Sequence, residues 1–167
     1  MPTTRRSRTI EAPVEELWRV IRDPHHLPRW WPRVNRVEDV DEGAFTEVMT
    51  TARGKVVRAD FNIVEVRESM HSLSWEQSVQ GTPFERVLKA ARTEVRLTAL
   101  GAGAAPVHAA GAGGPAETTG KGAATYVTIE LRQTLHGFFT RFGGYMVRRA
   151  TASTIEGALD GLERISG

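Results

Sequence analysis

Apolar and polar side chains alternate with a period of two through much of the chain. The segment 56–66 is the clearest case, because Val57, Phe61 and Ile63 fall on one side of it and Arg58 falls on the other. Such one-sided alternation is typical of strands in an antiparallel sheet with one covered face and one solvated face. The pattern predicts a short first strand at 6–11 and six later strands at 34–40, 45–51, 56–66, 70–79, 86–100 and 124–134.

Two short helices are predicted between the first and second strands. The apolar residues of 14–21 share one face at helical spacing, and Pro13 suits the first turn of that helix. Pro24 ends this helix and begins a second short one over 25–31, which Pro32 ends.

After Thr134 the apolar spacing changes to three and four residues, which predicts a helix running to the end of the chain. Its apolar positions are Phe138, Phe142, Tyr145, Met146, Ile155, Leu159 and Leu162. The pair Gly143-Gly144 lowers helix propensity by about 1 kcal/mol per glycine relative to alanine. We therefore expect a kink or a point of close packing there.

The order of elements predicts the fold class. A long amphipathic helix that follows a curved antiparallel sheet is expected to cross the apolar face of that sheet, which gives an α+β fold. The length of 167 residues suits a single domain over 1–167. The segment 101–123 is mostly Gly, Ala and Pro, and a loop of this length is either functional or disordered. We expect a disordered connector, because long surface loops cost little closure entropy.

Composition narrows the function classes. The chain has no cysteine, which excludes disulfides, thiolate nucleophiles and Cys-ligated zinc and suits a reducing cytoplasm. Its first residues carry positive charge without a following apolar run, and no stretch approaches the roughly 20 apolar residues of a membrane span. A net charge of +2 does not indicate a nucleic-acid partner. We expect a cytoplasmic protein without integral membrane association.

Several segments resemble the SRPBCC superfamily, the START-like group that includes polyketide cyclases/dehydrases and lipid-transport proteins. They are Ile10–Trp18, Asp23-Pro24, Leu27–Pro32, Arg92–Val95 and Gly143–Met146. The resemblance implies a helix-grip fold, in which about seven strands wrap around the C-terminal helix and leave a cavity between them. It implies no shared catalytic motif, so it does not separate binders from enzymes.

Candidate ligand-binding residues are those expected on the inner side of the sheet, on the last helix and beside the short helices. They are Trp30, Trp31, Phe61, Trp75, Ala91, Thr93, Phe138, Phe142 and Met146. Buried aromatics also serve as ordinary core, so each residue has that second interpretation. For Trp30 and Trp31 the alternatives are a pocket mouth and an anchor for the short helices.

Two residues are candidates for acid–base chemistry. His71 shares the phase of Leu73 and Trp75, and Lys89 shares the phase of Thr93, so both are expected on the inner side. The alternative for His71 is a structural role, because a lone histidine has no carboxylate partner for catalysis. The alternative for Lys89 is that it extends to water at the end of its strand. The histidines lack metal-ligand spacing, and we expect neither a metal nor a cofactor.

Three functions fit these patterns. The first is binding or transport of an apolar small molecule, such as a polyketide, lipid, isoprenoid or quinone-like compound. The second is a cyclase or dehydratase that acts on such a molecule by positioning it. The third is a protein-interaction module that uses the aromatic groove. The edge strands could also pair two copies into a homodimer.

Overall fold

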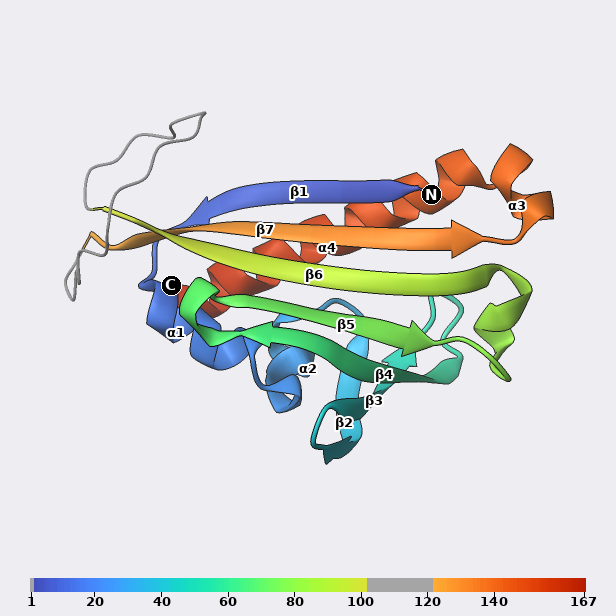
Figure 1. Ribbon diagram of the computed structural model, residues 1–167, viewed down its shortest axis with the longest axis horizontal. Helices are drawn as coiled ribbons and strands as arrows, with labels where there is room; N and C mark the ends of the chain where they lie inside the picture. The colour runs from blue at the N-terminus through green and yellow to red at the C-terminus, as the bar shows by residue number, and fades with distance from the viewer. Residues whose placement is uncertain (1, 102–121) are drawn as a thin grey trace.

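The computed structural model describes residues 2–101 and 122–167 (Figure 1). Most of the expected loop over 101–123 lies outside the described residues, as do the side chains of Phe139, Thr140 and Phe142. That loop joins two strands whose ends, Leu100 and Ala124, are cross-strand partners.

Seven strands of the described residues form one antiparallel sheet, in the order β1-β7-β6-β5-β4-β3-β2. The strands are β1 (Thr3–Ile10), β2 (Val34–Asp41), β3 (Ala44–Thr50), β4 (Val56–Arg67), β5 (Ser72–Ser78), β6 (Leu88–Leu100) and β7 (Ala124–Leu135). Each sequence-predicted strand is present, with ends that differ by a few residues. Short 3₁₀ helices follow β4 and β5, namely η2 (Glu68–Met70) and η3 (Pro83–Arg86). The predicted α+β helix-grip fold is confirmed.

The predicted alternation holds along β4. Ala59 is buried and Phe61 and Ile63 are half-buried, whereas Arg58 and Asp60 are exposed. The side of the sheet that carries these apolar residues is called the inner face. Register shifts interrupt the pairing of β4 with β5 and of β6 with β7. Such β-bulges add local bend and twist to a sheet.

The short helices lie where the sequence predicts them, as α1 (Val14–Ile21), η1 (Pro24–His26) and α2 (Leu27–Trp30). The expected single C-terminal helix is two helices, α3 (Gly137–Phe142) and α4 (Gly144–Ser166), separated at Gly143. The predicted kink at the glycine pair is therefore a break. None of the helices in the described part of the chain combines the length and the apolar character needed to cross a membrane.

Helix α4 runs obliquely across the inner face and contacts β1, β7 and α2 (Figure 1). Its residues Ile155, Leu159 and Leu162 are fully buried in the main core, together with α1, α2 and the inner face. Gly161 permits the closest approach, because a Cβ at this position would overlap the backbone of Trp30. A second, smaller apolar cluster lies at the start of β6 and the end of β7, around Leu88 and Leu135.

Candidate functional site

Four aromatic side chains form a continuous series of contacts on the inner face, which we call the inner aromatic row. Phe45 of β3 and Phe61 of β4 stack with ring centroids 5.3 Å apart and planes 9° apart. Trp75 of β5 meets Phe45 edge to face at 6.4 Å and meets Trp31 at 5.7 Å. The row therefore joins three neighbouring strands to the segment that follows α2.

The strand register explains why these rings meet. Phe45 and Phe61 are direct cross-strand partners, and Trp75 pairs with Ile63, two residues along β4. Partners in an antiparallel pair have Cβ atoms about 5 Å apart, which is close enough for aromatic rings to stack. Trp75 and Phe45 are each 3% exposed, whereas Phe61 and Trp31 are half-buried. The row thus has two sealed members and two that keep an accessible surface.

Trp30 lies behind the row as an anchor for the short helices. It is 1% exposed, it meets Trp31 edge to face at 5.3 Å, and its backbone lies against Gly161 of α4. Its indole nitrogen has no hydrogen-bond partner among the described residues. Of the two adjacent tryptophans, Trp31 contributes its ring to the inner aromatic row.

Neutral polar side chains lie on the inner face beside the row. Thr93 pairs with Trp75 and is 6% exposed, and Gln77 pairs with Phe61. Further along the same face, Gln133 of β7 accepts a hydrogen bond of 2.9 Å from the hydroxyl of Thr151 on α4. These groups can donate or accept hydrogen bonds without carrying charge.

Several inner-facing positions at the centre of the sheet keep accessible surface. Phe61, Gln77, Ala91 and Gln133 are half-buried, although they belong to the inner-facing positions of β4 to β7. The main core and the small cluster around Leu88 are separate groups of contacts. Phe61 packs against the main core and Ala91 against the small cluster. With Gln77 and Gln133, they combine apolar surface with neutral polar groups.

Glu47 is a buried acid on the same face. It lies two residues after Phe45 in β3, a strand whose pairing with β4 is unbroken, so both side chains point to the inner face. Its cross-strand neighbours are Val37 and Ala59, and it is 2% exposed. Burial raises the pKa of Glu47 to about 8, and no other group contributes to this shift. Glu47 therefore carries a proton at neutral pH.

Glu130 is also buried, but its surroundings produce the opposite result. It lies on the outer face of β7 and is 4% exposed. Burial opposes its ionisation, but hydrogen bonds from Arg5 at 2.6 Å and Arg132 at 2.5 Å outweigh that cost and lower its pKa. The two pKa values therefore shift in opposite directions because Glu130 has cationic partners and Glu47 has none, although both acids are buried.

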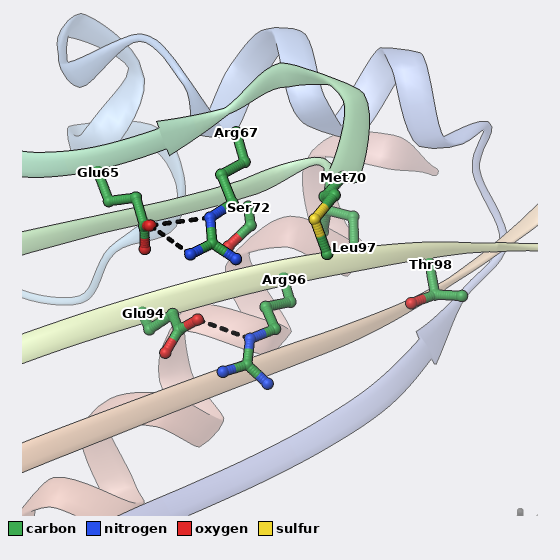
Figure 2. A pocket seen from close by; sticks show the side chains of 8 residues that line it. All are labelled: Glu65, Arg67, Met70, Ser72, Glu94, Arg96, Leu97 and Thr98. Atoms are coloured by element: carbon green, nitrogen blue, oxygen red, sulfur yellow. Dashed lines mark hydrogen bonds and ion pairs between the residues drawn. The ribbon is translucent and has the colours of Figure 1, made fainter. Parts of the chain in front are cut away.

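A hollow of about 510 Å³ lies on the outer face of β4, β5 and β6 (Figure 2). Arg67 is paired with Glu65 at 2.5 Å and Arg96 with Glu94 at 2.6 Å, and these four side chains line it. Because each charged group already has a partner, the hollow offers an ion-paired polar surface. It lies on the other side of the sheet from the inner aromatic row.

The structure places His71 away from the inner aromatic row. His71 follows η2 with φ of 45°, a left-handed conformation that interrupts the expected strand phase. Its Nε2 lies 2.7 Å from Oε1 of Glu15, and its ring packs edge to face on Trp18 at 5.5 Å. Trp18 in turn donates a hydrogen bond of 2.7 Å to Glu68. This group ties the β4–β5 connection to α1.

Lys89 does not take the expected inward position. A register shift between Leu88 and Ala90 changes the phase of β6, and Lys89 is exposed. After the shift, Ala91 and Thr93 point inward as predicted. Within residues 2–101 and 122–167, no group of three His, Asp or Glu side chains is arranged to hold a metal ion.

The candidates on the C-terminal helices lie apart from the inner aromatic row. Phe138 is 81% exposed and Met146 is 73% exposed, as is Tyr145 beside it at 75%. The side chain of Phe142 lies outside the described residues. Phe138, Tyr145 and Met146 are thus exposed apolar side chains on α3 and the first turn of α4.

Sequence reasoning missed four residues of the inner face: Phe45, Glu47, Gln77 and Gln133. The alternation of Phe45, Glu47 and Met49 places the acid in phase with an aromatic residue. The sequence signal for Glu47 is therefore a charged residue at a strand position where the alternation predicts an apolar one.

The comparisons with known proteins agree with this architecture. The family model for polyketide cyclase / dehydrase and lipid transport matches residues 1–166. No curated protein matches the chain.

Solved structures share its fold at low sequence identity. XoxI from Bacillus cereus is 12% identical, with a TM-score of 0.69 over 99% of this chain and 96% of that one. A START superfamily protein from Mycobacterium smegmatis is 12% identical, with a TM-score of 0.67 over 98% and 96%. The di-domain ARO/CYC BexL from the BE-7585A biosynthetic pathway is 18% identical, with a TM-score of 0.69 over 98% of this chain and 46% of its own length. The chain belongs to the polyketide cyclase/dehydrase and lipid transport family.

Proposed function

We propose that the protein binds an apolar small molecule between the inner face of the sheet and α4, as a carrier or non-catalytic binder in the cytoplasm. The inner aromatic row carries this proposal. It offers flat apolar surface on Trp31 and Phe61, both half-buried, beside the neutral polar groups Gln77 and Thr93. Apolar lining with a few polar groups is the usual composition of small-molecule sites.

The shape of the surface favours a flat ligand. Phe45 and Phe61 stack nearly parallel, and Trp75 and Trp31 extend the row edge to face. Aromatic rings gain stabilisation from offset stacking and edge contacts with another ring. A polyketide or quinone-like compound with fused rings suits this surface better than a flexible acyl chain. The match to the polyketide cyclase / dehydrase and lipid transport family supports a polyketide as the ligand class.

A cyclase or dehydratase activity is the second candidate, and Glu47 is the observation that favours it. A protonated acid on the inner face can serve as a proton donor to a bound molecule. His71 and Lys89 lie off the inner face, so they offer no such group there. We infer that any proton transfer in this site would involve Glu47 instead.

Native mass spectrometry of the purified protein, compared with denaturing spectra, tests the binding proposal. We expect a stoichiometric small-molecule adduct, and a raised melting temperature with a flat aromatic compound such as anthraquinone. Phe61→Ala should reduce both effects, whereas Tyr126→Ala on the outer face should leave them unchanged. No adduct, together with no thermal shift across a panel of lipids, polyketides and quinones, would overturn the proposal. The exposed apolar side chains on α3 and α4 would then favour a protein-interaction module.

A further inference from the structure

Glu47 is the one buried acid in the described chain without a hydrogen-bond or ion-pair partner. Its side chain points to the inner face beside Phe45, and only 2% of its surface is exposed. Its cross-strand neighbours, Val37 of β2 and Ala59 of β4, carry no polar side-chain group. Nothing in the described residues therefore explains the acid as part of a structural hydrogen-bond network.

An acid without a partner is costly at this depth, even though its carboxyl oxygens keep a little accessible surface: among the described residues, only Trp30 Nε1 is a fully sealed side-chain atom without a hydrogen bond. Burying a polar group without a hydrogen bond costs about 1–3 kcal/mol by protein mutational data. A leucine would fill the same space between Val37 and Ala59 without that cost. A side chain that lowers stability and makes no internal hydrogen bond or ion pair is a functional-site candidate.

The acid is neutral at physiological pH because burial raises its pKa to about 8. No titratable or charged side chain faces it from β2 or β4, where Val37 and Ala59 flank it, or from Phe45 and Met49 on its own strand. A protonated carboxyl offers one O–H donor, whereas an ionised one can only accept. Glu47 is thus a donor directed at the inner face.

The surrounding charges indicate which ligands the site accepts. The inward-facing positions of β3 to β7 carry neither lysine nor arginine in the described chain, and Lys89 is exposed. On β1, Arg8 faces α4 but is already paired with Asp160 at 2.5 Å and Glu163 at 3.0 Å. An anionic ligand, such as a free fatty acid, would lose its hydration without gaining a cation.

We propose that Glu47, as a neutral acid, donates a hydrogen bond to a carbonyl or ether oxygen of an uncharged aromatic ligand lying against Phe45 and Phe61. This inference rests on the proposed function and narrows it to uncharged, oxygen-bearing ligands. The same contact would polarise a ligand carbonyl, so it also specifies which residue would act as the acid in a cyclase or dehydratase.

A matched pair of ligands tests the inference. Fluorene and 9-fluorenone have nearly the same shape and differ by a carbonyl oxygen. Equilibrium dialysis gives the dissociation constant of each for the wild type, for Glu47→Leu and for Glu47→Gln. One neutral hydrogen bond is worth about 1 kcal/mol, which is roughly a fivefold change in affinity. We expect Glu47→Leu to shift the fluorenone-to-fluorene preference about fivefold toward fluorene, and Glu47→Gln, which keeps an N–H donor, to shift it less.

A second measurement needs no variant. The infrared carbonyl stretch of fluorenone bound to the wild type should lie below its position in hexane, because a hydrogen bond weakens the C=O bond. Fluorene-2-carboxylate should bind more weakly than either neutral compound.

The outcomes separate the two proposals. Fluorene binding with an unchanged preference in Glu47→Leu and a hexane-like stretch would overturn the role of Glu47 and leave the apolar binding function standing. Tighter binding of the carboxylate would also overturn it. If neither neutral compound binds, the proposed function fails and the inference fails with it.

Discussion

The ring of Trp31 meets the ring of Trp75 edge to face, with centroids 5.7 Å apart and planes 72° apart. Trp31 directly follows the four-residue helix α2, whereas Trp75 lies in the middle strand of the sheet order. The contact connects the short helices to the inner face and continues the series of ring contacts that includes Phe45 and Phe61. It therefore makes the position of α2 part of the site.

Replacement of Trp31 should separate binding from folding. Because Trp31 is half-buried and Trp30 supplies the buried anchor, we expect Trp31→Leu to weaken anthraquinone binding by at least about fivefold, in line with the ~1 kcal/mol of an aromatic pair. Isothermal titration calorimetry measures the affinity, and a thermal melt checks that the variant is folded. Tyr126→Leu on the outer face is the control and should bind as the wild type does. Equal loss in both variants would contradict this assignment.

The ionisation of Glu47 should appear in the pH dependence of stability. Between its ordinary pKa of 4.5 and its folded value of about 8, the folded protein holds a proton that the unfolded chain has lost. The free energy of unfolding should therefore fall as pH rises through this window, by up to a few kcal/mol, and this group should contribute no further loss above it.

Urea unfolding near the two ends of that window measures this change. Glu47→Gln removes the titration, so its stability should depend less on pH and should exceed that of the wild type at the alkaline end. Glu16→Gln, at an exposed position of α1, is the control and should keep the wild-type dependence. A pH profile of Glu47→Gln that matches the wild type would show that the acid ionises normally.

The contact between Gly161 and Trp30 should not tolerate a methyl group. The clash involves backbone atoms of Trp30, so neither a rotamer change nor a flexible side chain can relieve it. We expect Gly161→Ala to destabilise the protein by about 1–3 kcal/mol, as overpacking does in other cores. Gly144→Ala is the comparison, since its added Cβ would approach only the far end of Arg148, at 4.0 Å. Chemical denaturation of both variants gives the two free energies, and similar values would contradict the close packing.

His71 and Lys89 should be dispensable for ligand binding. His71 contacts Glu15 and Trp18 on α1, and Lys89 is exposed. We expect His71→Ala to lower stability by about 1–2 kcal/mol, because it removes the pair with exposed Glu15 and the edge contact with Trp18. Lys89→Ala should have no measurable effect. Anthraquinone affinity should stay unchanged in both variants. A loss of affinity in either variant would contradict this prediction and would show that the residue contributes to ligand binding.

The strand pattern predicted the sheet well because burial of one face imposes a strict two-residue period. Val57, Phe61 and Ile63 were placed together from spacing alone, and the register of β4 confirms the inward direction of Phe61. The glycine pair likewise marked the break between α3 and α4. Local chemistry was sufficient in both cases.

Two candidates were misplaced because a single backbone irregularity changes the direction of a side chain. The bulge between Leu88 and Ala90 moves Lys89 out of phase, and the left-handed conformation of His71 turns it toward α1. Neither residue type requires such a conformation, so the sequence carries no clear signal of it. Glu47 was missed for another reason: an acid in a strand is ordinarily assigned to the solvated face.

Strand β1 lies at the edge of the sheet and pairs only with β7, its partner for every residue from Thr3 to Ile10. Helix α4 covers it from the inner side, so all of its main contacts come from the last part of the chain. During synthesis, β1 can pair only after β7, which follows it by more than 100 residues, has been made. Pairing over such long separations slows folding. The pairing of β1 with β7 is therefore expected to be a late step in the folding of this sheet.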